Sequence, residues 1–269
     1  MFLTNVFAAA VGLFFSPPDV FDATEGASNC RVGHIIFQQG SCSACLAFAS
    51  SAALGYRMCL NENQDFMPSP FRMFDCLAED CEHGLTITSV EGVRMLGIGD
   101  INATPPIFGW GCEFKQDTAI SDWVGYFAYG EASMKTDIYL FGPAVADIFV
   151  DPLFHMYRGL PDVFQMEHIS RIPLKTINSL HAVVIVGWGT DPEPHWVIQN
   201  SWGVDWGRYG RAKIPITALT SHHSWRSDRY FWSDLTLLCG WMTAMAVLST
   251  VFIHSMSCVG KCFGLDLFT

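Results

Sequence analysis

The sequence has little charge, and basic residues are especially scarce. Charged side chains make up 15% of the 269 residues, and 15 Lys and Arg stand against 26 Asp and Glu, a formal net charge of -11. No cluster of Lys or Arg occurs. Because nucleic acids are bound mainly through basic side chains that neutralise phosphates, we expect no nucleic-acid partner. A hydrophobic content of 50% argues against a disordered chain.

Internal repeats, low-complexity tracts and blocks of like charge are also missing. The length suits one enzyme-sized unit with a sizeable core. Residues 42–60 are rich in Ala and Leu, and they predict a helix whose first turn holds Cys45 and which Ser41 or Ser43 caps. Beyond residue 140, short apolar runs bounded by turns predict strands. The predicted fold class is α+β.

Two apolar segments suggest targeting or membrane contact. Residues 1–16 are too short to span a bilayer and fit a secretory signal, although no basic residue precedes Arg31; a packed N-terminal strand is the alternative. Residues 235–253 carry no charge and are long enough to cross a membrane. A buried helix of a globular domain would show the same pattern. We expect entry into the secretory pathway, with membrane anchoring through 235–253 as one of two interpretations.

The ten cysteines are unevenly distributed, and seven of them precede residue 113. In a secreted chain this odd number predicts three disulfides and one unpaired thiol. The alternative is that Cys42 and Cys45, with Cys76 and Cys81, bind zinc or form a redox pair. The C-x4-C spacing of the second pair and the lack of a nearby set of histidines disfavour zinc.

Two apolar runs, 181–189 and 195–199, flank a turn at 189–194. A hairpin folded at this turn places His181 opposite Asn200. A single histidine at a strand end is usually structural. An unpaired thiol upstream changes that interpretation, because thiol and imidazole together make a nucleophile with its base.

Three motifs occur in chain order: Q-G-S-C-x-x-C-x-A-F in residues 39–48, H-A-V in 181–183, and N-S-W-G-x-x-W-G-x-x-G in 200–210. Together they resemble the papain family of cysteine proteases. The V-F-D-A of residues 20–23 is similar to the start of the mature chain of cathepsin B. The resemblance implies a papain-like, two-lobed fold, with a helical left lobe and a β-barrel-like right lobe.

The likeness covers residues 17–214, which we assign to a peptidase domain, and 215–269 form a divergent tail. It implies a cysteine endopeptidase in which Cys45, as a thiolate, pairs with the His181 imidazolium. Asn200 would orient that ring, and Gln39 with the Cys45 backbone N–H would hold the oxyanion. The implied substrate-binding residues are Gly84 and Trp202. The implied disulfides are Cys30 with Cys59, Cys42 with Cys81, and Cys76 with Cys112.

The resemblance also implies peptide or protein substrates, cystatin-type inhibitors, and a lysosomal, endosomal, vacuolar or extracellular location. It implies no cofactor and no metal. Residues 112–123 are too few for the loop with paired histidines of cathepsin B, so we expect an endopeptidase. Two departures from the family pattern, Leu46 in place of Trp and His83 in place of Gly, leave an alternative: a catalytically impaired homologue that binds peptides.

Overall fold

The computed structural model describes residues 16–78, 80–82, 85, 98–103, 106–109, 123–164, 179–219 and 221–227. The chain divides into two units, 1–226 and 227–269, and nearly all described residues belong to the first. The segment 235–253 and the signal segment, apart from Ser16, lie outside the described residues. Among the helices that are described, none has the length and apolar character needed to cross a bilayer.

The predicted helix around Cys45 is confirmed as α3, Cys45–Glu62. The predicted capping by Ser41 or Ser43 is wrong, because the N-cap is Ala44 and no side chain caps the helix. The Ser43 N–H donates instead to the Cys81 carbonyl (2.9 Å), so the chain entering the helix is tied to another segment. The first backbone N–H groups of α3 are therefore left without a side-chain acceptor.

Short helices pack around α3 and form the helical lobe. Ser69 caps α4, and its side chain accepts from the N–H of Arg72 (3.4 Å). Phe48 of α3 packs edge-on against Phe71 of α4, with ring centroids 5.2 Å apart. The remaining elements of this part of the chain are α2, Ala23–Gly26; η1, Arg31–His34; α4, Pro70–Leu77; and η2, Ile101–Ala103.

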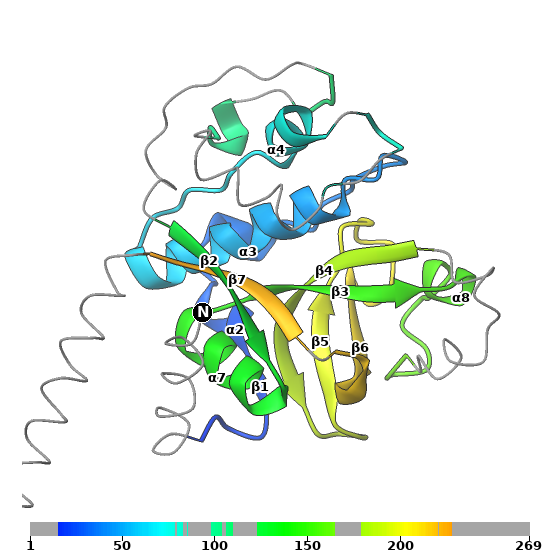
Figure 1. Ribbon diagram of the computed structural model, residues 1–269. Helices are drawn as coiled ribbons and strands as arrows, with labels where there is room; N and C mark the ends of the chain where they lie inside the picture. The colour runs from blue at the N-terminus through cyan, green and yellow to red at the C-terminus, as the bar shows by residue number, and fades with distance from the viewer. Residues whose placement is uncertain are drawn as a thin grey trace, which may run out of the picture. The chain divides into compact units, whose positions relative to one another are not determined.

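An antiparallel sheet makes up the other lobe (Figure 1). Its strands follow the order β2-β7-β3-β4-β5-β6, and β1 pairs separately with β4. Their bounds are β1, Phe21–Asp22; β2, Trp123–Tyr129; β3, Ala144–Val150; β4, Ser179–Gly189; β5, His195–Gln199; β6, Arg211–Pro215; and β7, Ser221–Ser227. The helix α7, Glu131–Phe141, packs against β2 and β4.

The sheet contradicts the expected β-barrel-like lobe and agrees with the expected α+β class. Among the described strands the sheet is open, because its two ends, β2 and β6, pair with inner strands and not with each other. The expected β-barrel-like lobe is therefore wrong: α7 covers the sheet, which does not close on itself. The α+β class is confirmed. β7 also brings part of the segment assigned to the divergent tail into the sheet, between β2 and β3.

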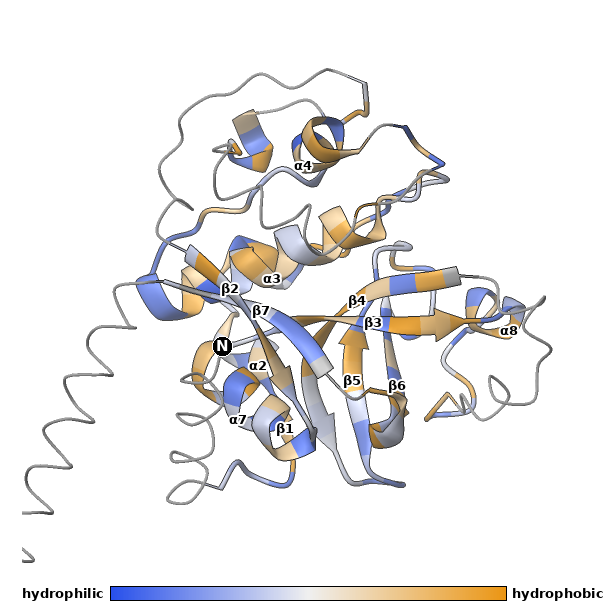
Figure 2. Ribbon diagram, viewed as in Figure 1, coloured by the Kyte–Doolittle hydropathy of each residue, from blue (hydrophilic) through white to orange (hydrophobic). Residues whose placement is uncertain are grey.

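Alternating residues of β4 separate two hydrophobic clusters. Ala182, Val184 and Val186 face the cluster around α3, whereas Val183 and Ile185 belong to a second cluster with α7, β5 and β6. Figure 2 shows hydrophobic residues concentrated on α3 and along these inner strands. This two-residue period is what a strand buried on both faces requires. β4 thus packs against both hydrophobic clusters, and His181 lies near the beginning of this strand.

The hairpin of β4 and β5 forms at the predicted turn, but its register differs from the prediction. Val184 pairs with Gln199 and Gly189 with His195, so His181 and Asn200 are not cross-strand partners. The register shifts between Ile185 and Gly187. A side chain at Gly187 would place its Cβ 2.1 Å from the Phe21 carbonyl oxygen, because β1 pairs there. The pairs Gly189 with His195 and Trp188 with Trp196 centre the hairpin at position 192, so the strands are offset from the register that would pair His181 with Asn200.

Candidate active site

One pocket gathers most of the predicted site residues. It has a volume of about 540 Å³ and contains Gln39, Cys45, His181 and Trp202 in its lining. The start of α3 supplies Cys45, the start of β4 supplies His181, and two loops supply the others. Asn200 is buried next to His181, to which it is hydrogen-bonded. The tertiary structure therefore brings together side chains that are separated by up to 163 positions (202 − 39).

Cys45 is the first residue of α3 and the free cysteine among those described. Burial raises the pKa of its thiol above the ordinary value. Backbone N–H groups of Ala182, Leu46 and Cys45 itself oppose that shift, because they stabilise a negative sulfur. Leu46, which replaces the tryptophan of the family pattern, is 5% exposed and packs into the cluster around α3. The substitution is thus accommodated as core packing.

His181 is 4% exposed, and its Nε2 lies 2.7 Å from Asn200 Oδ1. Since the amide oxygen only accepts, Nε2 carries the proton and donates it. Nδ1 is then the nitrogen that can take a proton from another group. Burial lowers the pKa of His181 to about 4; the hydrogen bond to Asn200 opposes this shift and the neighbouring His155 adds to it.

The raised pKa of Cys45 and the lowered pKa of His181 indicate the charges of these two groups before substrate binds. Burial favours the neutral thiol of Cys45 and the neutral imidazole of His181. The hydrogen bonds of these two described side chains do not include one between thiol and ring. In this arrangement His181 is a neutral base beside a protonated nucleophile.

Gln39 is buried and held in one orientation. Its Nε2 donates to the Cys42 carbonyl (2.9 Å), and its Oε1 accepts from the Ser201 hydroxyl (2.6 Å). An amide NH₂ has two hydrogens, so one remains for a further acceptor. The role of Ser201 was missed by the sequence reasoning, although its place directly after Asn200 was a usable signal. Ser201 also links the two halves of the site, because its N–H donates to Asn200 Oδ1 (2.8 Å).

Trp202 stacks against two imidazoles. Its ring centroid is 4.4 Å from that of His181 at an interplanar angle of 31°, and 4.4 Å from that of His155 at 13°. The Trp202 ring therefore shields the hydrogen bond between His181 and Asn200 from water on that side. His155 was not anticipated, because nothing in the local sequence distinguishes it from an ordinary surface histidine.

Comparison with known proteins identifies the chain. The family model described as papain family cysteine protease matches residues 17–219. The chain belongs to this family. The geometry above agrees with that assignment, since nucleophile, base and amide groups share one pocket.

Similar papain-family proteins come from diverse sources. The chain is 27% identical over 234 residues to a gut-specific cysteine proteinase of Caenorhabditis elegans, covering 74% of this chain and 69% of that protein. It is 29% identical over 185 residues to a viral cathepsin of Epiphyas postvittana nucleopolyhedrovirus, covering 65% and 54%. Cathepsin K of Mus musculus is 30% identical over 186 residues, covering 65% and 54%. The chain thus spans between about half and two thirds of the length of these curated relatives.

Solved structures support the papain fold. Procathepsin B S9 from Trypanosoma congolense has a TM-score of 0.66 at 23% identity, covering 79% of this chain and 78% of that one. Procathepsin L 3 of the Tenebrio molitor larval midgut has a TM-score of 0.64 at 20% identity, covering 78% and 70%. At these identities the likeness concerns the fold alone.

The disulfides stabilise the papain-type helical lobe next to the nucleophile. Cys30 is bonded to Cys59 and Cys42 to Cys81, two of the pairings that the resemblance implied. The bond between Cys42 and Cys81 excludes the zinc and redox interpretations of these cysteines. Cys76 is disulfide-bonded, and Cys112, its implied partner, lies outside the described residues, as do Gly84 and His83.

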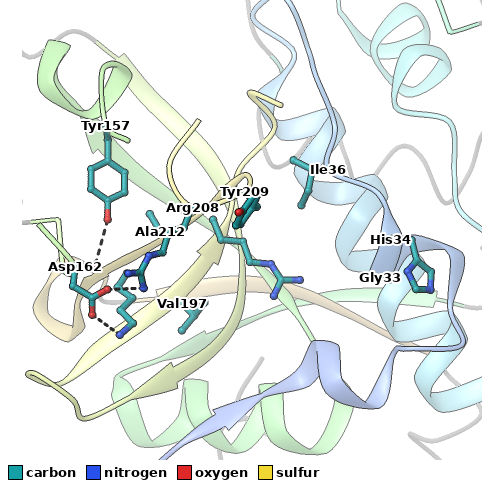
Figure 3. Close-up of a pocket in the computed structure, with 11 residues that line it drawn as sticks. Gly33, His34, Ile36, Tyr157, Asp162, Val197, Arg208, Tyr209 and Ala212 are labelled. Atoms are coloured by element: carbon teal, nitrogen blue, oxygen red, sulfur yellow. Dashed lines mark hydrogen bonds and ion pairs between the residues drawn. The ribbon is translucent and has the colours of Figure 1, made fainter. Parts of the chain in front are cut away.

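A second pocket, of about 470 Å³, is lined partly by β5 and β6 (Figure 3). Asp162 lies in it between two cations: Lys213 Nζ is 2.6 Å from one carboxylate oxygen and Arg208 Nη1 is 2.9 Å from the other. No cysteine is among its lining residues. Because Asp162 already pairs with both of these cations, we assign no catalytic role to this pocket.

Proposed function

We propose that this protein is a cysteine endopeptidase that hydrolyses peptide bonds through a thioester intermediate. The observation that carries the proposal is the shared pocket of Cys45, His181 and Gln39, with Asn200 behind the imidazole. Family membership supports the same chemistry. Each of these residues supplies one of the functions that amide hydrolysis by a thiol needs.

The mechanism begins with proton transfer from Cys45 to Nδ1 of His181. The transfer creates thiolate and imidazolium together, so each charge compensates for the burial of the other. The sulfur attacks the carbonyl carbon, and the imidazolium then protonates the leaving amine nitrogen as the C–N bond breaks. His181, again neutral, removes a proton from water, which attacks the thioester and releases the acid and the Cys45 thiol.

Both tetrahedral intermediates need hydrogen-bond donors for their oxyanion. We assign this role to the remaining N–H of the Gln39 side chain and to the backbone N–H of Cys45, which no side chain caps. Asn200 acts through His181, whose ring it orients. Trp202 covers that hydrogen bond, and Gly84 would pair with the substrate backbone.

Finer features of the proposal rest on resemblance. We propose a cathepsin B-like enzyme that lacks that enzyme's carboxylate-binding loop, because residues 112–123 are few and contain no histidine. The V-F-D-A of residues 20–23 supports this placement, while cathepsin K and a cathepsin L-like proteinase are also similar to the chain. Peptide or protein substrates, cystatin-type inhibitors, and a secretory, endosomal or lysosomal location belong to the same proposal.

A catalytically impaired homologue that binds peptides is the second candidate. Three observations favour it: Leu46 replaces the tryptophan of the family, burial raises the pKa of Cys45, and no hydrogen bond joins its thiol to His181 within the described structure. Such a protein would bind peptides in this pocket and would not hydrolyse them.

Labelling by a peptide epoxide or fluoromethylketone separates the two candidates. An active peptidase should become modified at Cys45 in a 1:1 ratio, and loss of cleavage of a quenched peptide should follow the extent of labelling. Cys45→Ala should abolish both, and His181→Ala should slow both by at least about 10²-fold, because the base is lost. Cleavage that persists in folded Cys45→Ala would refute the proposal. Peptide binding by wild type without labelling or cleavage would establish the second candidate.

A further inference from the structure

Two cationic side chains in the catalytic pocket have no part in the proposed mechanism. His155 ends the short helix α8, Pro152–His155, and Arg158 follows it three positions later. Both are exposed, and both line the pocket that contains Cys45 and His181. The flat stacking of His155 on Trp202 holds its ring at the pocket wall. The position of these two cations relative to the reacting atoms is therefore defined by the fold.

Most donors of these two side chains are free within the described part of the chain. The Arg158 guanidinium donates one hydrogen bond, from Nη1 to the Tyr157 carbonyl (2.9 Å), and no described residue accepts from the His155 ring. Asp205 is the carboxylate that lines the same pocket, and it forms no ion pair with either cation among the described residues. The Arg158 guanidinium and the His155 ring therefore keep donors that a ligand in this pocket can use.

The chemistry of the reaction places these cations beside the leaving part of the substrate. His181 must reach the amine nitrogen of the scissile bond, so the leaving peptide has to pass on the His181 side of Cys45. Trp202 stacks on His181, and His155 stacks on Trp202. We therefore expect the leaving peptide to run along this stack of rings, in the pocket that Arg158 also lines.

We propose that His155 and Arg158 form a subsite for a carboxylate on the leaving peptide, carried either by an acidic side chain or by the C-terminus. The inference rests on the proposed peptidase function and names a substrate preference for it. A guanidinium and an imidazole N–H are suitable hydrogen-bond donors to a carboxylate.

Three quenched peptides with the same residues before the scissile bond test the subsite. The first has Gln in the leaving part and an amidated end, the second has Glu there and an amidated end, and the third has Gln and a free C-terminal carboxylate. We expect kcat/KM to be about three- to fivefold higher for at least one acidic peptide at pH 5.5. The peptide that gains identifies the source of the carboxylate.

Variants connect this preference to the two cations. His155→Phe keeps a ring that stacks on Trp202 and removes the ring nitrogens, and Arg158→Gln removes the guanidinium charge. In each variant, the ratio of kcat/KM for the acidic peptide to that for the neutral peptide should fall toward one. Arg208→Gln changes an exposed cation that does not line this pocket and should keep the wild-type ratio.

Equal rates for the three peptides at pH 5.5 would overturn the subsite and leave the peptidase proposal intact. If no peptide is cleaved, the peptidase proposal fails, and binding still decides the subsite: folded Cys45→Ala protein should bind an acidic peptide about three- to fivefold more tightly than the neutral one, measured by calorimetry. Equal dissociation constants there would refute the carboxylate subsite.

Discussion

At the scale of single residues, the site depends on side chains that orient the reacting groups. Gln39 lies where a catalytic donor is needed, and its amide is held at Nε2 by the Cys42 carbonyl (2.9 Å) and at Oε1 by the Ser201 hydroxyl (2.6 Å). The backbone N–H of Gln39 also donates to the Ser201 carbonyl (2.9 Å). Ser201 is therefore a positioning residue for the proposed oxyanion site.

Ser201→Ala should lower kcat by about tenfold and change KM little, because the donor to the transition state is disordered and the substrate contacts remain. Gln39→Ala removes that donor altogether and should cost about 10²-fold in kcat. Steady-state kinetics on one quenched peptide measure both. If Ser201→Ala had wild-type kcat, or if it were as damaging as Gln39→Ala, the positioning role would be refuted.

At the scale of secondary-structure elements, a buried charged network joins α3, α7 and β7. Arg57 of α3 is fully buried and donates to Asp137 of α7 (2.7 Å), which also accepts from His222 (2.6 Å) and Ser224 (2.9 Å) of β7. Burial alone would raise the pKa of Asp137, but Arg57 and these hydrogen bonds hold it well below its usual range. The network explains how β7 is fixed to the rest of the unit.

Asp137→Ala should lower the free energy of unfolding by about 3–5 kcal/mol, because it leaves the Arg57 guanidinium buried without its counter-ion. Glu131→Ala on the same helix is the matched control: it breaks an exposed pair with Lys135 (2.7 Å) and should cost less than about 1 kcal/mol. Urea denaturation followed by fluorescence measures both values. Similar losses in the two variants would show that the network contributes no more than a surface pair.

At the scale of the whole molecule, buried neutral histidines make stability depend on pH. The pKa of His181 is lowered by burial from 6.5 to about 4, and burial also lowers the pKa of His222. Between pH 6.5 and 4, the unfolded chain therefore binds protons that the folded chain does not. The contribution of these neutral histidines to the free energy of unfolding is complete above pH 6.5, and it decreases as the pH falls through this window.

The free energy of unfolding should decrease by up to about 1.4 kcal/mol per pH unit for each such histidine. His181→Asn removes one of these histidines. Between pH 6.5 and 4, the free energy of unfolding of this variant should therefore change with pH less steeply, by up to about 1.4 kcal/mol per pH unit. Urea unfolding at half-unit intervals of pH would measure the two slopes. A slope that is unchanged in folded His181→Asn protein would contradict the proposed burial of a neutral imidazole.

The sequence alone predicted which residues form the candidate site and whether each lies on a helix or a strand. The seven cysteines before residue 113 already predict an unpaired thiol. The helix at Cys45 and the strands on either side of residues 189–194 follow from local pattern, because helical and strand periods are visible in the chain itself. The family resemblance added Gln39 and Trp202. Local pattern could not show that α3 begins after Ala44 without a side-chain cap, or that the Ser43 N–H is bonded to the distant Cys81 carbonyl.

The tertiary structure alone decided which groups touch. The register of β4 and β5 follows from where the turn lies and from the shift between Ile185 and Gly187, so His181 reaches Asn200 without being its cross-strand partner. The open sheet depends on how strands far apart in the sequence order themselves. The resting charges of Cys45 and His181 depend on burial, and the stack of His155 on Trp202 depends on packing. These are long-range properties, and no local sequence pattern encodes them.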